Sequence, residues 1–440
     1  MWKTKISKWK KLDNAAKIFP AMAVRDDSEV FRLSCQLKET IDPQVLQRAV
    51  DSAIEDYPMF THTIRRGLFW YYLESTGYTP KVHEENKTPL QPLYSEGSRL
   101  LIDISYYKKR INFEVFHALA DGTGAFVFFS AIITNYLCEV HADELSGVDI
   151  LSTDLTDRQK ESDGFTQYFE PGIGSSTNFE FLGDKDKKNK VYHFHEQHTP
   201  DYRQLATEGL LSAKKIIDAA KNEGATVTEF LCAHLILAIY ETMEPRDRNK
   251  SIAVAIPVNL RNYFKSDTIR NFFGIIQVTY DFSSGKDHSL AQVIKSVHDS
   301  FQKELTHEHM LQKLASQVKM ERHPIVRVCP LVIKDLVVMS LQSKSMKRRT
   351  ITLSNVGKIK LQPEISQYIE LFDVFNSSSS RQVCLCTFED NMVISFSGVL
   401  AEHDVERAFF RSLAKYDDEI TISTNYSPKD FDSSRYVTDI

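Results

Sequence analysis

Cysteine is scarce in this sequence: six occur in 440 residues, and no two of them form a C-x-x-C pair. Cys384 and Cys386 share one face of a predicted strand, where neighbouring side chains do not make a favourable disulfide. Scattered cysteines of this kind usually behave as small buried hydrophobic residues in a reducing compartment. The sequence therefore predicts no disulfide framework and favours a cytoplasmic protein.

Charge of one sign and long hydrophobic runs are also lacking. The net charge is −5, which favours neither nucleic acid nor an anionic membrane as a partner. The basic clusters at 3–11 and 344–349 are short, as solvated surfaces and loops usually are, and the alternative for the second is that it holds the phosphates of an anionic cofactor. The longest apolar run, 125–137, is too short to cross a bilayer, and the basic N-terminal segment has no apolar core or cleavage site. We expect no nucleic-acid partner, no integral membrane segment and no secretion signal.

The composition is that of a globular protein, with 42% hydrophobic and 26% charged residues, and the chain is long for one core. From 143 to 190 it is rich in Asp, Ser, Gly and Lys and has little apolar periodicity. Such a stretch is too long for an ordinary loop. We therefore predict an N-terminal domain at 1–142, a linker or crossover at 143–190, and a C-terminal domain at 191–440.

Patterns in the N-terminal part predict an α/β layer on a mixed sheet. Residues 31–37 alternate as a strand does, and Asp42-Pro43 supplies an N-cap and a favoured first residue for a helix that ends before Pro58. The remaining pattern gives strands at 61–65, 68–74, 100–107 and 110–117, and then a long apolar helix ending near 140.

The C-terminal part has the same style. Thr226 and Glu229 form a capping box for a helix, and Gly224 fits the end of the helix before it. A strand at 350–353 is expected to end in the turn SNVG. The other expected elements are strands at 191–196, 251–259, 383–388 and 392–398, and helices at 290–319, 324–341 and 403–415. The pattern predicts two α/β halves that face each other.

One motif suggests chemistry. The predicted strand at 110–117 ends in His117, which precedes Asp121 and Gly122 in the order H-x-x-x-D-G. An imidazole at the end of a strand, next to a tight turn into a helix, can act as a positioned general base. The alternative is a hydrogen-bonded histidine at the edge of the core, and the Asp-Gly pair at a fixed offset favours the base.

Other histidines raise the alternative of a metal centre. His193 and His195 share a face of a predicted strand, and His198 follows shortly after. Beyond Glu196, no cysteine or carboxylate stands at ligand spacing from them. We therefore expect no metal site.

Three segments resemble landmarks of the chloramphenicol-acetyltransferase-like superfamily: HALADG at 117–122, VNLRNYF at 258–264 and SNVGKI at 354–359. That superfamily includes alcohol acyltransferases, peptide-synthetase condensation domains and wax-ester synthases. DNAAKIFPA, GLFWYYLE and GATVTEFL are most similar to bacterial alcohol acetyltransferase-like proteins. The resemblance covers most of the chain except 143–190. It implies an α/β fold of two similar domains, each a mixed β-sheet layered with helices, with a channel between them.

One position departs from part of the superfamily. Condensation domains and wax-ester synthases usually carry two adjacent histidines, and here the first of the two is Phe116. This difference favours the simpler HxxxD acyl transfer.

The resemblance also implies roles for the site residues. His117 would accept a proton from an alcohol or amine as it attacks a thioester, without a covalent acyl-enzyme. Ser354 and Asn355 are candidates to donate to the oxyanion, and Asn259 is a further candidate for the substrate site.

Three residues are expected to support the site. The resemblance implies an ion pair between Asp121 and an arginine, with Arg261 as the first candidate and Arg25 as the second. Gly122 is expected to allow a backbone geometry that a Cβ atom would crowd.

The function implied is transfer of an acyl group, acetyl first of all, from acyl-CoA as a co-substrate to a small alcohol or amine, with no permanently bound cofactor. Two other hypotheses stay open. One is a condensation-type enzyme that takes its acyl group from a carrier protein. The other is a catalytically silent relative that uses the channel for binding or regulation.

Overall fold

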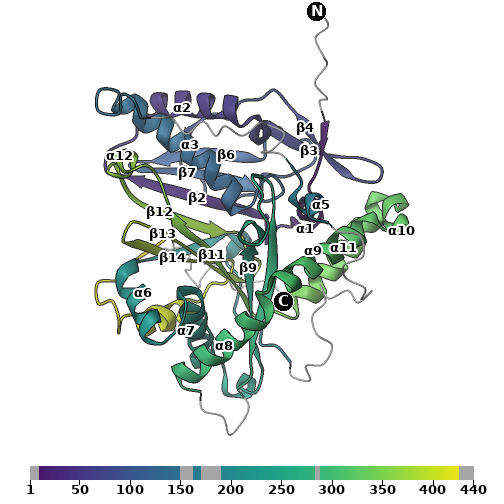
Figure 1. The fold of residues 1–440 in the computed structure, drawn as a ribbon, viewed down its shortest axis with the longest axis vertical. Coiled ribbons are helices and arrows are strands. Elements are labelled where there is room, and N and C mark those ends of the chain that lie inside the picture. Colours follow the sequence, from purple (N-terminus) through teal and green to yellow (C-terminus); the bar gives the residue numbers. More distant parts are fainter. Residues whose placement is uncertain (1–8, 149–161, 170–189, 283–287, 426–440) are drawn as a thin grey trace, which may run out of the picture.

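The computed structural model describes residues 9–148, 162–169, 190–282 and 288–425 (Figure 1). In its N-terminal part the predicted strands and the long apolar helix are all present. The elements are β1 Trp9–Lys11, α1 Phe19–Met22, β2 Val30–Leu37, α2 Pro43–Asp56, β3 His62–Arg66, β4 Tyr71–Ser75, β5 His83–Glu84, β6 Ile102–Tyr107, β7 Arg110–Phe116 and α3 Gly122–Val140.

The rest of the described chain holds most of the helices and the longer sheet. The elements are α5 Gly164–Gln167, β8 Leu205–Ser212, α6 Ala213–Asn222, α7 Val227–Thr242, β9 Ile252–Asn259, β10 Phe273–Tyr280, α8 Leu290–Glu304, α9 His307–Arg322, α10 Pro324–Val328, α11 Leu331–Met346, β11 Ile351–Ile359, α12 Pro363–Ser366, β12 Ile369–Asn376, β13 Arg381–Phe388, β14 Asn391–Gly398, α13 Asp404–Leu413 and β15 Thr421–Thr424.

These elements form two lobes. The upper lobe in Figure 1 has the sheet β12-β2-β7-β6-β5 with α2 and α3 packed over it, and the lower lobe has the sheet β10-β9-β11-β13-β14-β8-β15 with α6, α7 and α8. Both sheets are mixed, because β5 runs parallel to β6 and β11 runs parallel to β9 and β13. The α/β fold with two mixed sheets confirms the fold class predicted from the sequence.

Several local predictions are confirmed by the hydrogen bonds at helix ends. The Asp42 side chain accepts from two backbone N–H groups at the start of α2. The capping box of Thr226 and Glu229 is complete at the start of α7. Gly224, just past α6, has a φ of +67°, a left-handed value that glycine adopts without strain. Sequence and local geometry therefore agree at these three points.

Four predictions are wrong in detail. The helix expected at 324–341 is two, α10 and α11, which Cys329 and Pro330 separate. Residues 191–196 form no strand, because Val191 makes only an isolated bridge to Ser251. The single helix expected at 290–319 is two, α8 and α9, since Thr306 starts a new helix by capping His309 N–H. The SNVG segment is not a terminal turn. It lies inside β11 at a bulge after Asn355, where the Asn355 side chain accepts from the Gly357 N–H.

One strand crosses between the lobes. β12 comes from the second half of the chain but pairs antiparallel with β2 of the N-terminal sheet, from Ile369 opposite Leu37 to Asn376 opposite Phe31. β13 then returns to the other sheet, where it pairs with β11 and β14. β12 lies in the predicted domain 191–440 but completes a sheet of the predicted domain 1–142, and this pairing joins the lobes.

Helix α3 corrects the expectation about apolar runs. With 19 residues it is long and apolar enough, by length and composition alone, to cross a membrane. However, 67% of its apolar stretch is buried inside the protein, and Phe128 and Phe129 on this helix are fully enclosed. This burial is that of a core helix, which packs against α2 over the N-terminal sheet.

Candidate active site

His117 lies directly after β7, where its backbone N–H donates to the carbonyl of Glu29. Its half-buried ring stacks on the ring of Phe19, with centroids 4.5 Å apart and planes 15° apart. The rings of Phe31 and Phe273 lie 5.0 and 5.7 Å away. Because Phe273 begins β10 of the other lobe, the imidazole sits where the two lobes meet.

Asn271 fixes the orientation and tautomer of this ring. Its Nδ2 donates to the backbone carbonyl of His117 over 3.0 Å, which turns its Oδ1 toward His117 Nδ1 at 3.1 Å. Two acceptors cannot share a hydrogen bond, so Nδ1 must carry the proton. Nε2 is then the unprotonated nitrogen of the neutral ring. This is the nitrogen that can accept a proton from a substrate.

Burial also favours the neutral form. The apolar surroundings of the ring lower the pKa of His117 below its ordinary value, because they stabilise the charged imidazolium poorly. Asp121 and the hydrogen bond to Asn271 act in the opposite direction but are the smaller effects. A base that is already neutral near physiological pH needs no prior deprotonation.

Asn271 is the residue that sequence reasoning missed. It lies between VNLRNYF and β10, in a stretch without apolar periodicity, and no motif marks it. The one available signal was its position two residues before the strand that follows the VNLR segment. Asn271 orients the His117 ring by hydrogen bonds, and so it is a positioning residue.

Asp121 pairs with Arg261, the first candidate partner. Arg261 Nη1 donates to Asp121 Oδ2 over 2.7 Å, and both side chains are nearly buried. Asp121 also caps α3 through the Gly124 N–H at 2.9 Å and accepts from the Phe272 N–H at 2.8 Å. The second candidate, Arg25, instead pairs with Asp201 at the surface. The carboxylate does not contact the imidazole.

Arg261 holds the segment that carries Asn271. Its guanidinium donates to the carbonyls of Thr268 and Arg270 over 2.6 to 3.0 Å, and also to the Asn259 side chain. The Asp121–Arg261 pair therefore holds Arg270, just before Asn271, and Phe272, just after it. Asp121 also holds the start of α3. Through Asn271, this network sets the position of the His117 ring.

The expectation for Gly122 is wrong, and the tight glycine is Gly124. A Cβ atom at Gly122 would meet only the Val356 side chain at 3.9 Å, which is ordinary contact. A Cβ atom at Gly124 would lie 1.7 Å from the carbonyl oxygen of Ile269. The first turn of α3 thus packs directly on the backbone of the segment before Asn271, and only glycine permits this approach.

We expect Gly124→Ala to lower the free energy of unfolding by about 1–3 kcal/mol, because the methyl group must push the 269–272 backbone away. Gly122→Ala is the matched control two residues earlier in the same helix, where the change should stay within about 0.5 kcal/mol. Denaturant unfolding of both variants measures the difference. Equal stability of the two variants would contradict the packing described here.

The remaining candidates lie beside the start of α3 and on β11. Asn259 donates to the Thr123 hydroxyl over 3.1 Å at the start of α3. Asn355 donates to the Thr228 hydroxyl over 2.9 Å at the start of α7. Ser354 is half-buried on β11 opposite Cys384. With Val356 against Gly122, β11 reaches the start of α3, so the structure brings these segments into one neighbourhood.

A cavity of about 420 Å³ adjoins the SNVG segment. Asn355, Gly357 and Lys358 line one side of it, and Lys214 and Lys221 on α6 line another. Three carboxylates also line it: Asp218, Glu389 and Asp390. Its volume is that of a typical small-molecule pocket.

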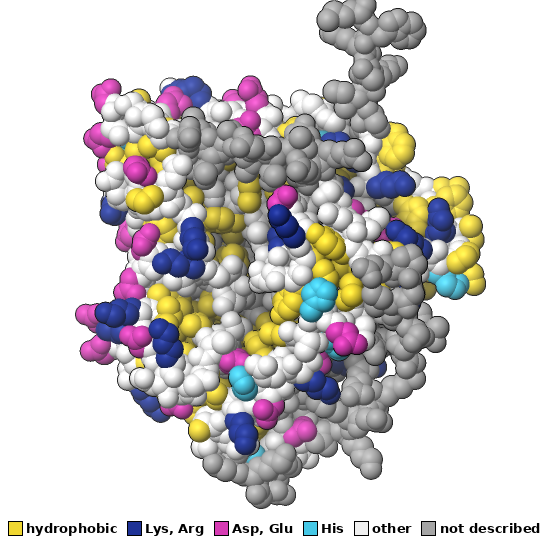
Figure 2. Space-filling view, viewed as in Figure 1, with side chains coloured by type: hydrophobic (Ala, Val, Ile, Leu, Met, Phe, Trp, Pro, Cys, Tyr) yellow, Lys and Arg dark blue, Asp and Glu magenta, His cyan; other side chains and the backbone are white. Residues whose placement is uncertain are grey.

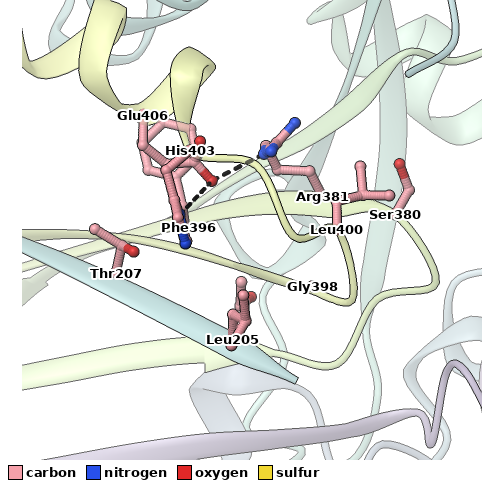
Figure 3. Close-up of a pocket in the computed structure, with 10 residues that line it drawn as sticks. Leu205, Thr207, Ser380, Arg381, Phe396, Gly398, Leu400, His403 and Glu406 are labelled. Atoms are coloured by element: carbon pink, nitrogen blue, oxygen red, sulfur yellow. Dashed lines mark hydrogen bonds and ion pairs between the residues drawn. The ribbon is translucent and has the colours of Figure 1, made fainter. Parts of the chain in front are cut away.

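A second hollow, drawn in Figure 3, lies between β8, β13, β14 and the start of α13. Arg381 is paired there with Glu406 at 2.9 Å and with Glu196 at 2.8 Å. The hollow measures about 10 Å³, which is hardly room for one water molecule. This cluster is a buried ion-pair network without room for a ligand.

The histidines near 195 do not converge. His193 Nε2 lies 3.2 Å from the carbonyl of Lys347, His195 faces Asp247 at 3.5 Å, and the His198 ring lies near Tyr202. Among the residues that the structure describes, no three His, Cys, Asp or Glu side chains form a group that could hold a metal ion.

Two lobes with mixed sheets thus meet at a strand-end histidine whose pKa is lowered by burial. The sequence model of the alcohol acetyltransferase family matches residues 174–409, more than half of the chain. The chain therefore belongs to this family. The matched range includes Arg261 and Asn355 but begins after His117.

Solved structures share this fold at low sequence identity. Polyketide synthase associated protein 5 from Mycobacterium tuberculosis is 15% identical with a TM-score of 0.61, covering 92% of this chain and 97% of that one. The trichothecene 15-O-acetyltransferase TRI3 from Fusarium sporotrichioides is 12% identical with a TM-score of 0.60, covering 94% and 96%. The first condensation domain of the calcium-dependent antibiotic synthetase is 14% identical with a TM-score of 0.62, covering 93% and 96%. No curated protein matches the sequence.

Phe116 occupies the place of the first histidine of the double-histidine motif. Its side chain is fully buried and stacks on Tyr94, with ring centroids 5.0 Å apart. It points away from the face that His117 occupies, as neighbouring residues at a strand end do. Phe116 therefore packs in the core of the N-terminal lobe.

Proposed function

We propose that this protein transfers an acyl group, acetyl first of all, from a CoA thioester to a small alcohol or amine, with His117 as the general base. The observation that carries the proposal is the His117–Asn271 pair. It leaves Nε2 unprotonated on a half-buried ring where the two lobes meet. Membership of the alcohol acetyltransferase family supports the class of reaction.

The reaction balances without a covalent acyl-enzyme. Nε2 of His117 takes the proton from the acceptor hydroxyl or amine as that group attacks the thioester carbonyl carbon. The tetrahedral intermediate collapses, the carbon–sulfur bond breaks, and the imidazolium returns its proton to the CoA thiolate. Holding both substrates together removes much of the entropic barrier.

Ser354 and Asn355 are the candidate donors to the oxyanion. The Asn355 amide already donates to Thr228, which fixes its orientation, and its neighbours line the cavity at the SNVG segment. Preorganised donors of this kind stabilise charge more than mobile ones, because they need no reorganisation during the reaction. Asn259, hydrogen-bonded to Thr123, is the further candidate for the substrate site.

The same cavity supports a CoA donor. Lys214, Lys221 and Lys358 can meet phosphate groups there. Of the three carboxylates in the same lining, Asp390 is occupied by the Ser212 hydroxyl and the Lys214 backbone N–H, and Asp218 and Glu389 remain beside the lysines. All six cysteines are free, and the proposal includes a cytoplasmic location.

A thioester-cleavage assay with acetyl-CoA and a panel of alcohols and amines tests this function. Turnover that depends on both acetyl-CoA and an acceptor would support it. Turnover with a phosphopantetheinyl carrier protein, but not with free CoA, would favour the condensation-type alternative. Binding of CoA without turnover, unchanged in His117→Ala, would favour a silent binding protein.

The pH profile tests the positioning role of Asn271. Because burial lowers the pKa of His117, the acidic limb of the wild-type kcat/KM profile should lie below the ordinary histidine value of about 6.5. Asn271→Asp puts a carboxylate beside Nδ1, which stabilises the imidazolium. The limb should then move upward by about one pH unit or more.

Asn271→Ala is the companion variant, since it removes the acceptor of the Nδ1 proton without adding charge. It should lower kcat while the acidic limb stays below that of Asn271→Asp. Initial rates between acidic and neutral pH provide the measurement. An unmoved limb in Asn271→Asp would show that the pair does not control the catalytic ring.

A further inference from the structure

Helices α10 and α11 leave a large apolar surface uncovered. In Figure 1 they project from the side of the molecule, and Figure 2 shows hydrophobic and basic side chains gathered on that projecting end. Ile325 and Val328 are each 70% exposed and Leu336 is 63% exposed. We call this the α10–α11 surface. Its large exposed side chains are Met320, Ile325, Val328, Val332, Ile333, Leu336, Val337 and Met339.

The polarity of α11 is inverted relative to an ordinary surface helix. Lys334 and Asp335 are the charged residues between 331 and 343, and both turn toward the body of the protein. Lys334 donates to the carbonyl of Phe69, and Asp335 pairs with Arg66 at 3.2 Å and with the Tyr71 hydroxyl at 2.9 Å. The apolar residues therefore face outward, whereas a surface helix normally buries them.

The neighbouring β3–β4 turn extends this surface. Leu331 N–H donates to the carbonyl of Leu68 over 2.9 Å, which anchors the start of α11 on the turn. Leu68 itself is 73% exposed and Phe69 is 40% exposed. A contiguous exposed apolar area of this kind marks an interaction site, since scattered single residues would not gather over two elements.

The charge around the surface differs in sign from that of the whole chain. Residues 318–349 hold eight Lys and Arg and two carboxylates, whereas the full chain has a net charge of −5. Both carboxylates are paired, Glu321 with Lys17 and Asp335 with Arg66. Arg327, Lys344 and Lys347 are exposed at the margins of the apolar area.

We propose that the α10–α11 surface docks this protein onto an anionic lipid bilayer, with α10 and the first turns of α11 lying in the interfacial plane. Exposed large apolar side chains on a projecting helix can enter the boundary between headgroups and acyl chains, and marginal cations attract anionic lipids. A second copy of the chain would bring the same positive charges together, which disfavours a symmetric pairing of this surface.

The docking surface also adjoins the proposed site. α11 packs against α1, and Phe19 of α1 stacks on the His117 ring. A bilayer on the outer face of α11 would thus be separated from the His117 ring by α11 and α1. This placement suits a lipophilic acceptor that partitions into lipid before it reaches the imidazole.

Flotation of the full-length protein with vesicles tests the proposal. One set contains phosphatidylcholine alone, and the other contains equal parts of phosphatidylcholine and phosphatidylglycerol. We expect the protein to float with the anionic set and to be released by salt. Val332→Asp with Leu336→Asp should reduce the partition coefficient by about tenfold or more. Neutralising Arg327, Lys344 and Lys347 to Gln should cost about fivefold for each cation, on anionic vesicles only.

Ile422→Asp is the matched control, because Ile422 is similarly exposed but lies on β15, far from these helices in the sequence. It should float as the wild type does, and unchanged thermal unfolding of every variant confirms the fold. No substrate is present, so a failure to float leaves the proposed acyl transfer standing. The proposal is overturned if the protein ignores anionic vesicles, if it floats equally with both sets, or if it is a dimer that Leu336→Asp dissociates without any flotation.

Discussion

His117→Ala is expected to reduce kcat/KM for acyl transfer by about 10²–10⁴-fold, the usual contribution of a positioned general base. The reason lies in the geometry around the ring. Asn271 holds the proton on Nδ1, and the three phenylalanine rings around the imidazole keep it neutral and fixed. No other group in this network can take the role, because Asp121 is engaged by Arg261 and does not contact the ring.

The same variant should remain folded. The ring is only half-buried, and its loss leaves the ion pair of Asp121 and the backbone contacts of β7 in place. Thermal unfolding therefore separates a catalytic loss from a folding loss. Acyl transfer at the wild-type rate in His117→Ala would refute the general-base role.

Asp121→Asn is expected to affect stability and activity together. The substitution leaves the Arg261 guanidinium charged, nearly buried and without its carboxylate, which typically costs about 3–5 kcal/mol. Activity should fall as well, because Arg261 holds the carbonyls of Thr268 and Arg270, just before Asn271, and so positions the catalytic ring. Denaturant unfolding and initial rates measure the two effects on one preparation.

Asp201→Asn is the matched control. Asp201 forms the same kind of ion pair with Arg25, but the two side chains are 90% and 71% exposed. Exposed pairs contribute about 0–1 kcal/mol, so this variant should keep both the stability and the activity of the wild type. Equal effects of the two substitutions would mean that the Asp121 pair has no special structural role.

Local signals in the sequence were sufficient for much of the fold. The cap at Asp42, the capping box at Thr226 and the hairpin of β13 and β14 follow from chemistry within a few residues. The strand at β12 was not predicted, because its pairing with β2 joins residues more than 300 positions apart. No short pattern specifies the edge to which a strand will add.

In the candidate site, too, some features follow from local sequence and others depend on contacts between distant segments. The position of His117 at the end of β7 was predictable from alternation, and the resemblance pointed to Arg261. Asn271 and the tight packing of Gly124 depend on how the 268–272 segment folds back on α3. Gly122 is part of the motif and drew attention for that reason, although the space at Gly122 is open.

The crossing of β12 has a consequence for any attempt to divide this protein. A fragment ending near residue 142 would expose the full length of β2 as an unpaired edge, with Phe31, Leu33 and Cys35 behind it. Open edges of this kind recruit other chains and aggregate. A fragment starting near 191 would carry β12 with nothing to pair against. The two halves look separable along the sequence, but the N-terminal sheet is complete only with β12 from the C-terminal half, and among the described strands β12 is paired only with β2.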